Sequence, residues 1–190
     1  MGDVMPERSM TPLGYMAKRI AACPPDWLDA PNVVDIYAVS DCISEDFCDY
    51  VGYWKHNGFW FFNSPEDIYA IATAELIDLS GTKMLYYQGY EKQYDADTRS
   101  WLAFVPVPDF PTHVVPPTDA ECLGFDVVTY SQGLPECSPL SCNGIASAVE
   151  VNEHCLLDSL DQALKLLEAG VFDKSEPGPY RIISVSRLVR

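Results

Sequence analysis

The sequence predicts an α+β protein with a mixed or mainly antiparallel sheet and about four helices. Predicted strands and helices do not alternate regularly along the chain, which argues against a parallel doubly wound sheet. Two strand-like runs flank the turn Asp95-Ala96-Asp97-Thr98, which predicts a hairpin. Hydrophobic residues make up 48% of the 190 residues, enough to form a core.

The first third of the chain predicts two helices and two strands. Residues 11–22 predict a short helix that stops at consecutive prolines. Residues 33–39 (VVDIYAV) predict a strand because they are rich in β-branched and aromatic side chains. Ser44 predicts the N-cap of a helix over residues 44–57, with acidic residues in its first turn. The apolar run 59–62 (FWFF) predicts a further short strand.

The middle of the chain carries the clearest helix start. Ser64 as N-cap and Pro65 at the first helical position predict a helix over residues 65–78. Residues 83–94 and 99–105 predict the two strands of the hairpin.

Five prolines fall within residues 105–117, a density that excludes a central strand or a helix interior. The chain is therefore either a single domain or two lobes joined by this segment. Beyond it, residues 125–131 predict a strand, residues 159–170 a helix with a capping box, and residues 180–189 a final strand.

The charge excludes two classes of partner. The formal net charge is −16, and no Lys or Arg occurs in residues 20–54 or 100–164. Such a surface repels the phosphates of nucleic acid and anionic membranes, and it attracts basic proteins. With no run of about 18 apolar residues and no secretory signal pattern, the sequence predicts a soluble, cytoplasmic protein.

The leading functional hypothesis is an acidic protein-binding module that docks on a basic partner protein and, in one version, inhibits it. The residues chosen for that surface are the acids around the predicted helix 44–57, namely Asp41, Glu45, Asp46 and Asp49. Surface charge of this kind accelerates association and makes it dependent on salt.

The alternative is an enzyme or zinc protein centred on the loop 136–144 (ECSPLSCNG). Cys137, Cys142, His154 and Cys155 are of the residue types that bind zinc in a tetrahedron, although the spacing of five between the two loop cysteines exceeds the usual one. In the enzymatic version, Cys142 is a nucleophile with His154 or His113 as its base.

The sequence predicts no cofactor, with zinc as the alternative. Neither GxxxxGK[ST] nor GxGxxG occurs, so no nucleotide-binding loop is expected. Cys42 and Cys48 are interpreted as ordinary structural thiols. Homo-oligomerisation through the aromatic run 59–62 is a further alternative.

Two segments carry a resemblance. ECSPLSCNG and SEPGPYRI resemble segments of a bacterial protein family of unknown function, over about the last third of the chain. The small, acidic, aromatic-rich profile is also similar to that of bacterial immunity proteins, which neutralise a toxin by binding it. That second resemblance implies a basic protein partner, in agreement with the charge.

Overall fold

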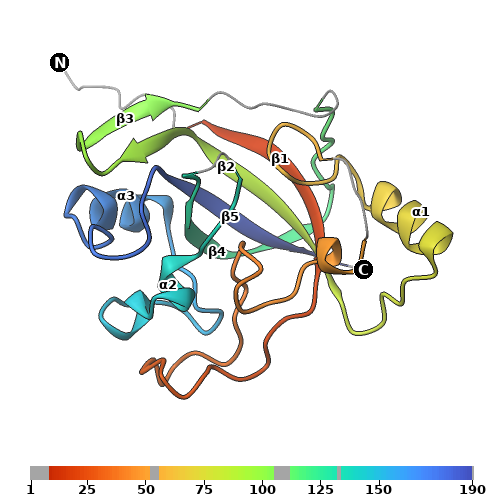
Figure 1. The fold of residues 1–190 in the computed structure, drawn as a ribbon, viewed down its shortest axis with the longest axis horizontal. Helices are drawn as coiled ribbons and strands as arrows, with labels where there is room; N and C mark the ends of the chain where they lie inside the picture. Colours follow the sequence, from red (N-terminus) through yellow and green to blue (C-terminus); the bar gives the residue numbers. More distant parts are fainter. Residues whose placement is uncertain (1–8, 52–55, 105–111, 132–133, 190) are drawn as a thin grey trace.

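A curved antiparallel sheet organises the chain in this computed structural model, which describes residues 9–51, 56–104, 112–131 and 134–189. Its strand order is β1 (Met10–Lys18), β2 (Lys83–Asp95), β5 (Tyr180–Leu188) and β4 (Ala120–Thr129), and β3 (Ser100–Ala103) pairs with β2 (Figure 1). Every pair is antiparallel. The predicted α+β class with a mainly antiparallel sheet is confirmed.

The central strands are buried on both faces. Neighbouring residues of a strand point to opposite sides of the sheet. On β4, Val128 belongs to one hydrophobic cluster and Val127 to the other, and on β5 Ile183 and Ile182 divide in the same way. The first cluster includes residues of α1 (Pro65–Glu75) and the second includes residues of α3 (Leu160–Glu168), so each face is covered by its own helix and loops.

Three α-helices occur in the described residues, fewer than the expected four: α1, α3 and the short α2 (Pro139–Cys142). Ser64 and Ser159 cap α1 and α3 as their sequences predict, each accepting a hydrogen bond from a backbone N–H three residues on. The 3₁₀ turns η1 (Phe47–Tyr50) and η2 (Ile145–Ser147) complete the helical structure in this part of the chain. None of the described helices is long and apolar enough to cross a bilayer.

The helix predicted over residues 11–22 is wrong, because this segment forms β1 along β2. The register shifts between Pro12 and Gly14, where Gly14 adopts φ +139°. A Cβ at Gly14 would lie 2.4 Å from the carbonyl oxygen of Phe62, so only glycine allows this close approach. Pairing with β2 thus determines the structure of this segment.

The helix predicted over residues 44–57 is also wrong as far as the described residues extend. Ser44 turns inward and donates to the Ile36 carbonyl at 2.7 Å, and Asp46 begins the single turn η1 instead. Val51 is already extended. Residues 52–55 lie outside the described part.

Two predicted strands are single bridges instead. In residues 33–39, Ile36 bridges Ala21, and in residues 59–62, Phe62 bridges Tyr15. Three of the four aromatic residues of the second run are buried in the first cluster (Phe59, Phe61 and Phe62). Those three side chains therefore pack within the chain, and homo-oligomerisation through the run stays a prediction.

The structure agrees with the predicted hairpin and with two later predicted strands. The hairpin is confirmed, with Tyr94 opposite Trp101, and so are the strands predicted over residues 125–131 and 180–189. Of the proline-rich segment 105–117, residues 105–111 lie outside the described part, and the alternative of two lobes stays a prediction.

Candidate thiolate metal centre

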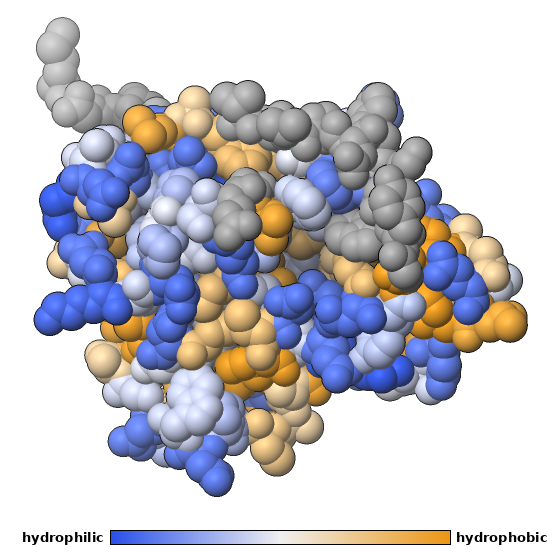
Figure 2. All heavy atoms as spheres, in the orientation of Figure 1, coloured by the Kyte–Doolittle hydropathy of each residue, from blue (hydrophilic) through white to orange (hydrophobic). Residues whose placement is uncertain are grey.

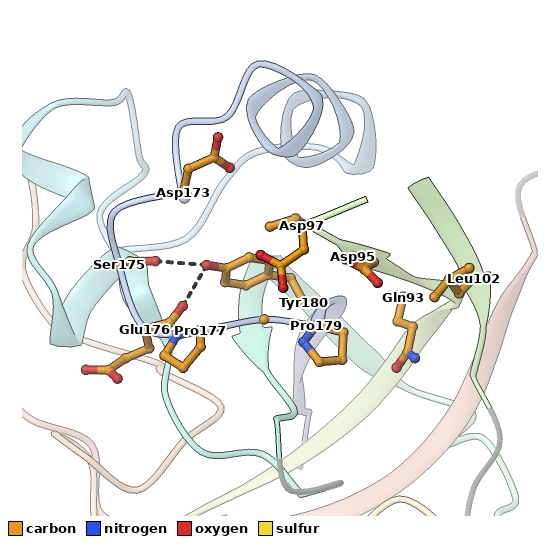
Figure 3. A pocket seen from close by; sticks show the side chains of 12 residues that line it. Gln93, Asp95, Asp97, Leu102, Asp173, Ser175, Glu176, Pro177, Pro179 and Tyr180 are labelled. Carbon is orange, nitrogen blue, oxygen red and sulfur yellow. Dashed lines mark hydrogen bonds between the residues drawn. The ribbon is translucent and has the colours of Figure 1, made fainter. Parts of the chain in front are cut away.

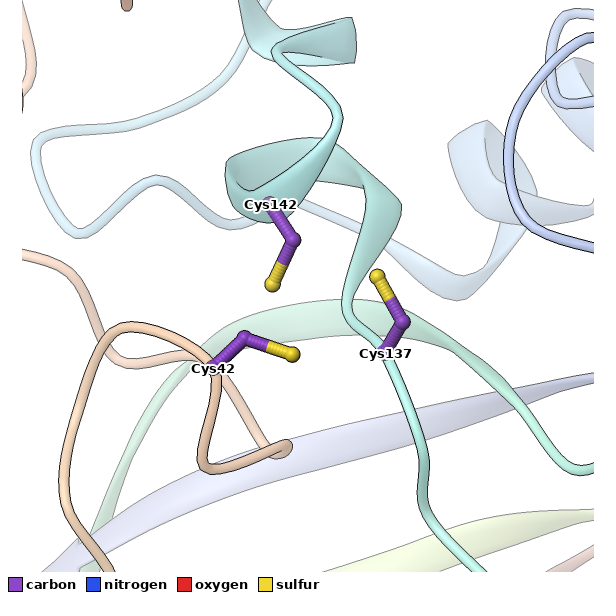
Figure 4. A group of neighbouring side chains, drawn as sticks. All are labelled: Cys42, Cys137 and Cys142. Atoms are coloured by element: carbon purple, nitrogen blue, oxygen red, sulfur yellow. The ribbon is translucent and has the colours of Figure 1, made fainter.

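Three cysteines from two distant parts of the chain meet at the end of the sheet. The sulfur atoms of Cys42, Cys137 and Cys142, here called the thiol cluster, all lie within 4.8 Å of one another. Figure 4 shows Cys42 reaching from its loop toward Cys137 and Cys142, which sit on the segment that leads into and through α2. Among the described residues, this is the one group of three or more potential metal ligands that converge so closely.

The position of Cys137 follows from the end of β4. Thr129 donates its N–H to the Cys137 carbonyl at 2.9 Å, and its side-chain oxygen accepts the Cys137 N–H at 3.1 Å. The chain then turns at Ser138 into α2, where the Cys142 N–H donates to the Ser138 carbonyl at 2.9 Å. One helical turn therefore brings Cys142 back over Cys137.

A buried polar network attaches the loop of Cys42 to this turn. Asp126 Oδ2 accepts hydrogen bonds from the Ser138 hydroxyl at 2.6 Å and from the Val39 N–H at 2.9 Å. The Ser40 N–H in turn donates to Ser138 Oγ at 3.1 Å. Asp126 and Ser138 are 1% and 0% exposed. The two halves of the thiol cluster are thus fixed relative to each other through β4.

Lys18 also binds the loop that carries Cys42. Lys18 at the end of β1 is fully buried, and its ammonium donates to the carbonyls of Ala38, Val39 and Ser40 at 2.7, 2.9 and 2.7 Å. It also pairs with Asp46 at 2.8 Å. A buried cation with this many oxygen partners keeps its charge compensated.

The three sulfurs shift one another's pKa values, lowering that of Cys42 and raising those of Cys137 and Cys142. Hydrogen bonds from the thiols of Cys137 and Cys142 lower the pKa of Cys42 below the ordinary thiol range. The pKa of Cys137 is raised by its interactions with the sulfurs of Cys142 and Cys42 and by burial. With its pKa lowered, Cys42 loses its proton more readily than an ordinary thiol, and the thiolate is the form that binds a metal ion.

The cluster opens into a cavity of about 430 Å³, lined by Glu136 and Glu176 as well as the three cysteines. No Lys, Arg or His lines it among the described residues. Asn143 sits on its wall, accepting from Cys137 Sγ at 3.4 Å and donating to Glu176 at 3.4 Å. The acidic rim favours entry of a cation.

This cavity continues toward a second acidic hollow. Glu176 and Pro177 line both, and the second, of about 350 Å³, is bordered by Asp95, Asp97 and Asp173. Figure 3 shows these carboxylates around Tyr180, whose hydroxyl contacts Ser175 and donates to the Glu176 carbonyl. Asp173 also pairs with Arg99 at 3.2 Å.

Two of the four ligands predicted from the sequence, Cys137 and Cys142, belong to the thiol cluster, and two do not. His154 Nδ1 lies 2.6 Å from Asp35, and its ring packs edge-on against Tyr37. Cys155 is buried in the second hydrophobic cluster. With no histidine on the cavity wall in the described residues, a Cys142 nucleophile has neither His154 nor His113 beside it there.

Cys42 was missed by sequence reasoning, which interpreted it as a structural thiol. Its partners lie about a hundred residues away along the chain, and sequence spacing carries no signal of that contact. The one local hint is the polar, turn-forming context Ser40-Asp41, which presents Cys42 at the surface.

The acids chosen for partner binding divide into structural and exposed ones. Asp46 is committed to Lys18, and Asp49 accepts the Asp46 N–H at 2.9 Å in a capping box. Glu45 contacts Arg19 and Tyr50. Asp41 is exposed. In the space-filling view hydrophilic side chains are interspersed with hydrophobic ones over the visible face (Figure 2).

A comparison of the sequence with family models and curated proteins, and of the structure with solved structures, finds no match.

Proposed function

We propose that this protein binds a thiophilic metal ion, zinc first, through the thiolates of Cys42, Cys137 and Cys142. The observation that carries the proposal is the convergence of three sulfur atoms within 4.8 Å. With Zn–S bonds of about 2.3 Å in a tetrahedron, the sulfurs of a zinc site lie about 3.8 Å apart. The three sulfurs must therefore approach one another from their present separation of at most 4.8 Å.

The proposed ion has three protein ligands and a fourth position that faces the acidic cavity. Three protein ligands with an open position are typical of exchangeable or catalytic zinc, whereas structural zinc has four. Soft thiolate ligands also suit Cu(I), which a three-coordinate site accommodates. A centre of free thiols needs a reducing compartment, so the cytoplasm is the proposed location.

Titration of the metal-free, fully reduced protein with zinc tests this proposal, with native mass spectrometry and a competing chelator as readouts. We expect one zinc ion per chain and a loss of affinity of about a hundredfold or more on replacing any cluster cysteine by Ser, because each removes one metal–sulfur bond. Substituting Co(II) would give thiolate-to-cobalt charge-transfer absorption.

Two control variants make the result specific. Cys122→Ser removes an exposed cysteine outside the cluster. His154→Ala removes a ligand of the set predicted from sequence. Both are expected to retain zinc. If His154→Ala abolished binding while Cys42→Ser did not, the proposed ligand set would be wrong.

A second candidate function is docking on a basic partner protein. Its support is that Asp41, Asp46 and Asp49 line one cavity of about 280 Å³ together with Trp60. Carboxylates and an aromatic residue on the wall of one cavity suit a lysine or arginine side chain. Because Asp46 and Asp49 also have structural roles, Asp41 is the residue to test.

The test for docking is binding of a lysine-rich peptide at low and high salt. Asp41→Lys is expected to weaken binding at low salt, whereas Asp158→Lys, which makes the same charge change at an exposed residue outside that cavity, should have a smaller effect. Equal effects of both variants would reduce this candidate to nonspecific attraction by net charge.

A further inference from the structure

The three cysteines of the thiol cluster differ in exposure. Cys42 is exposed, Cys142 is partly buried and Cys137 is buried. Cys42 also belongs to a different segment from the other two, as Figure 4 shows. An oxidant arriving from solvent therefore meets the sulfur of Cys42 first, and two further sulfurs lie within 4.8 Å of it.

We infer that the thiol cluster is a peroxide-driven dithiol–disulfide couple in which Cys42 becomes bonded to Cys137 or Cys142 and the metal ion is released. The inference rests on the proposed function for the ion, and on the geometry of the three sulfurs alone for the disulfide. It adds a control of metal binding by hydrogen peroxide.

The reaction balances with hydrogen peroxide as the sole oxidant. The Cys42 sulfur attacks one peroxide oxygen, the O–O bond breaks, and a sulfenic acid and one water form. A neighbouring cluster sulfur then attacks the sulfenic sulfur, and the hydroxyl leaves as a second water. Two thiols lose two electrons and two protons, and one peroxide becomes two waters.

Disulfide formation brings two cluster sulfurs from a separation of at most 4.8 Å to bonding distance. The bond length is about 2.05 Å, so the sulfurs must approach from their present separation. Cys42 Sγ donates to the Glu136 carbonyl at 3.3 Å, and this weak contact is given up as the exposed side chain rotates. The Asp126–Ser138 hydrogen bond keeps the two segments together meanwhile.

Oxidation removes the ligands that a metal needs. A disulfide sulfur is a poor ligand compared with a thiolate, so forming one bond leaves a single thiolate in the cluster. One thiolate at the edge of an open cavity does not retain zinc. The couple thus links the redox state of the surroundings to metal occupancy.

The experiment uses the full-length protein in a Cys23→Ser/Cys122→Ser background, which removes the exposed cysteines outside the cluster. Metal-free and zinc-loaded samples are treated with hydrogen peroxide, and their intact mass is measured before the remaining thiols are alkylated for peptide mapping. We expect a mass loss of about 2 Da, a link between the Cys42 peptide and the peptide of residues 137–142, and loss of the bound zinc.

Cys42→Ser is expected to slow disulfide formation about tenfold or more, since the exposed attacking sulfur is gone. A disulfide that joins Cys137 to Cys142 in the protein with Cys42 intact would overturn the inference, and so would stepwise oxygen addition without a mass loss. Retention of zinc after the disulfide has formed would equally overturn it.

The two proposals fail in different ways. If the reduced protein binds zinc but peroxide gives no disulfide, this inference fails and metal binding stands. If the reduced protein binds no zinc but the Cys42 disulfide forms, the proposed function fails, and the inferred control of metal binding fails with it.

Discussion

Ser138 donates its hydroxyl to Asp126 Oδ2 across 2.6 Å, and this hydrogen bond lies where the two segments of the thiol cluster meet. The same carboxylate oxygen accepts the Val39 N–H at 2.9 Å, close to Cys42 in the chain. Asp126 therefore acts as a positioning residue for both sides of the candidate centre, from a strand that contributes no sulfur.

The first prediction concerns the pH dependence of stability. Burial raises the pKa of Asp126 to about 7, despite hydrogen bonds from Ser138 and Val39 that lower it. The folded protein thus holds this proton more tightly than the unfolded chain, whose Asp pKa is about 3.9. The stability that this proton contributes is complete below about pH 4. It falls by up to about 1.4 kcal/mol per pH unit as the pH rises from there, and the fall ends as the pH passes about 7.

Asp126→Asn is neutral at every pH and can still accept both hydrogen bonds. We expect its free energy of unfolding, measured with urea at pH 5, 6 and 7, to fall less with rising pH than that of the unchanged protein. Parallel curves for the two proteins would show that Asp126 is ionised throughout.

Lys18→Met should destabilise the protein strongly. It leaves Asp46 and three carbonyls without their buried cation, and breaking such a pair costs about 3–5 kcal/mol. Lys174→Met, at an exposed position, is the matched control and should change the free energy of unfolding by less than about 0.5 kcal/mol. Similar losses in both variants would refute the anchoring role of Lys18.

Asn143→Ala tests the surroundings of the candidate metal centre. When Cys137 is a thiolate it accepts rather than donates, so the amide of Asn143 would turn its N–H₂ toward the sulfur. Loss of this partner should weaken zinc binding about tenfold or more while the free energy of unfolding of the metal-free protein stays nearly unchanged. Chelator competition measures the first quantity and urea unfolding the second.

Gly124→Ala probes the bulge of β4. Gly124 adopts φ +144° at a register shift, and a Cβ there would lie 2.8 Å from both Leu156 Cβ and the Leu157 carbonyl. Strained backbone and overpacking together should cost about 2 kcal/mol or more. Gly81→Ala also has a positive φ but meets no atom within 4 Å, so it isolates the backbone contribution.

Local signals predicted the elements whose causes are local. Ser64 and Ser159 cap their helices, and the turn after Tyr94 joins the hairpin, because turn and cap chemistry is written within a few residues. The sequence predicts a helix over residues 11–22, whereas in the structure β1 pairs with β2, about 70 residues later in the chain. A choice between helix and strand made by distant pairing leaves little trace in the segment itself.

Two of the three cysteines of the thiol cluster are predicted from the sequence, because only these two lie close together in the chain. Cys137 and Cys142 share one loop and stand out together, whereas Cys42 joins them through the fold. His154 contacts Asp35 and is not part of the thiol cluster. His154 and Cys155, chosen because they lie close to the loop in the sequence, therefore make other contacts in the fold.

The ammonium of Lys18 performs, for the loop 38–46, the organising task that a calcium ion performs in many binding loops, with carbonyl and carboxylate oxygens gathered around one positive charge. This cation is covalently tethered, so it cannot dissociate or be chelated. The loop that presents Cys42 therefore needs no second ion to acquire its shape. The free energy of binding of the proposed metal ion would then contribute to its affinity and not to folding this loop.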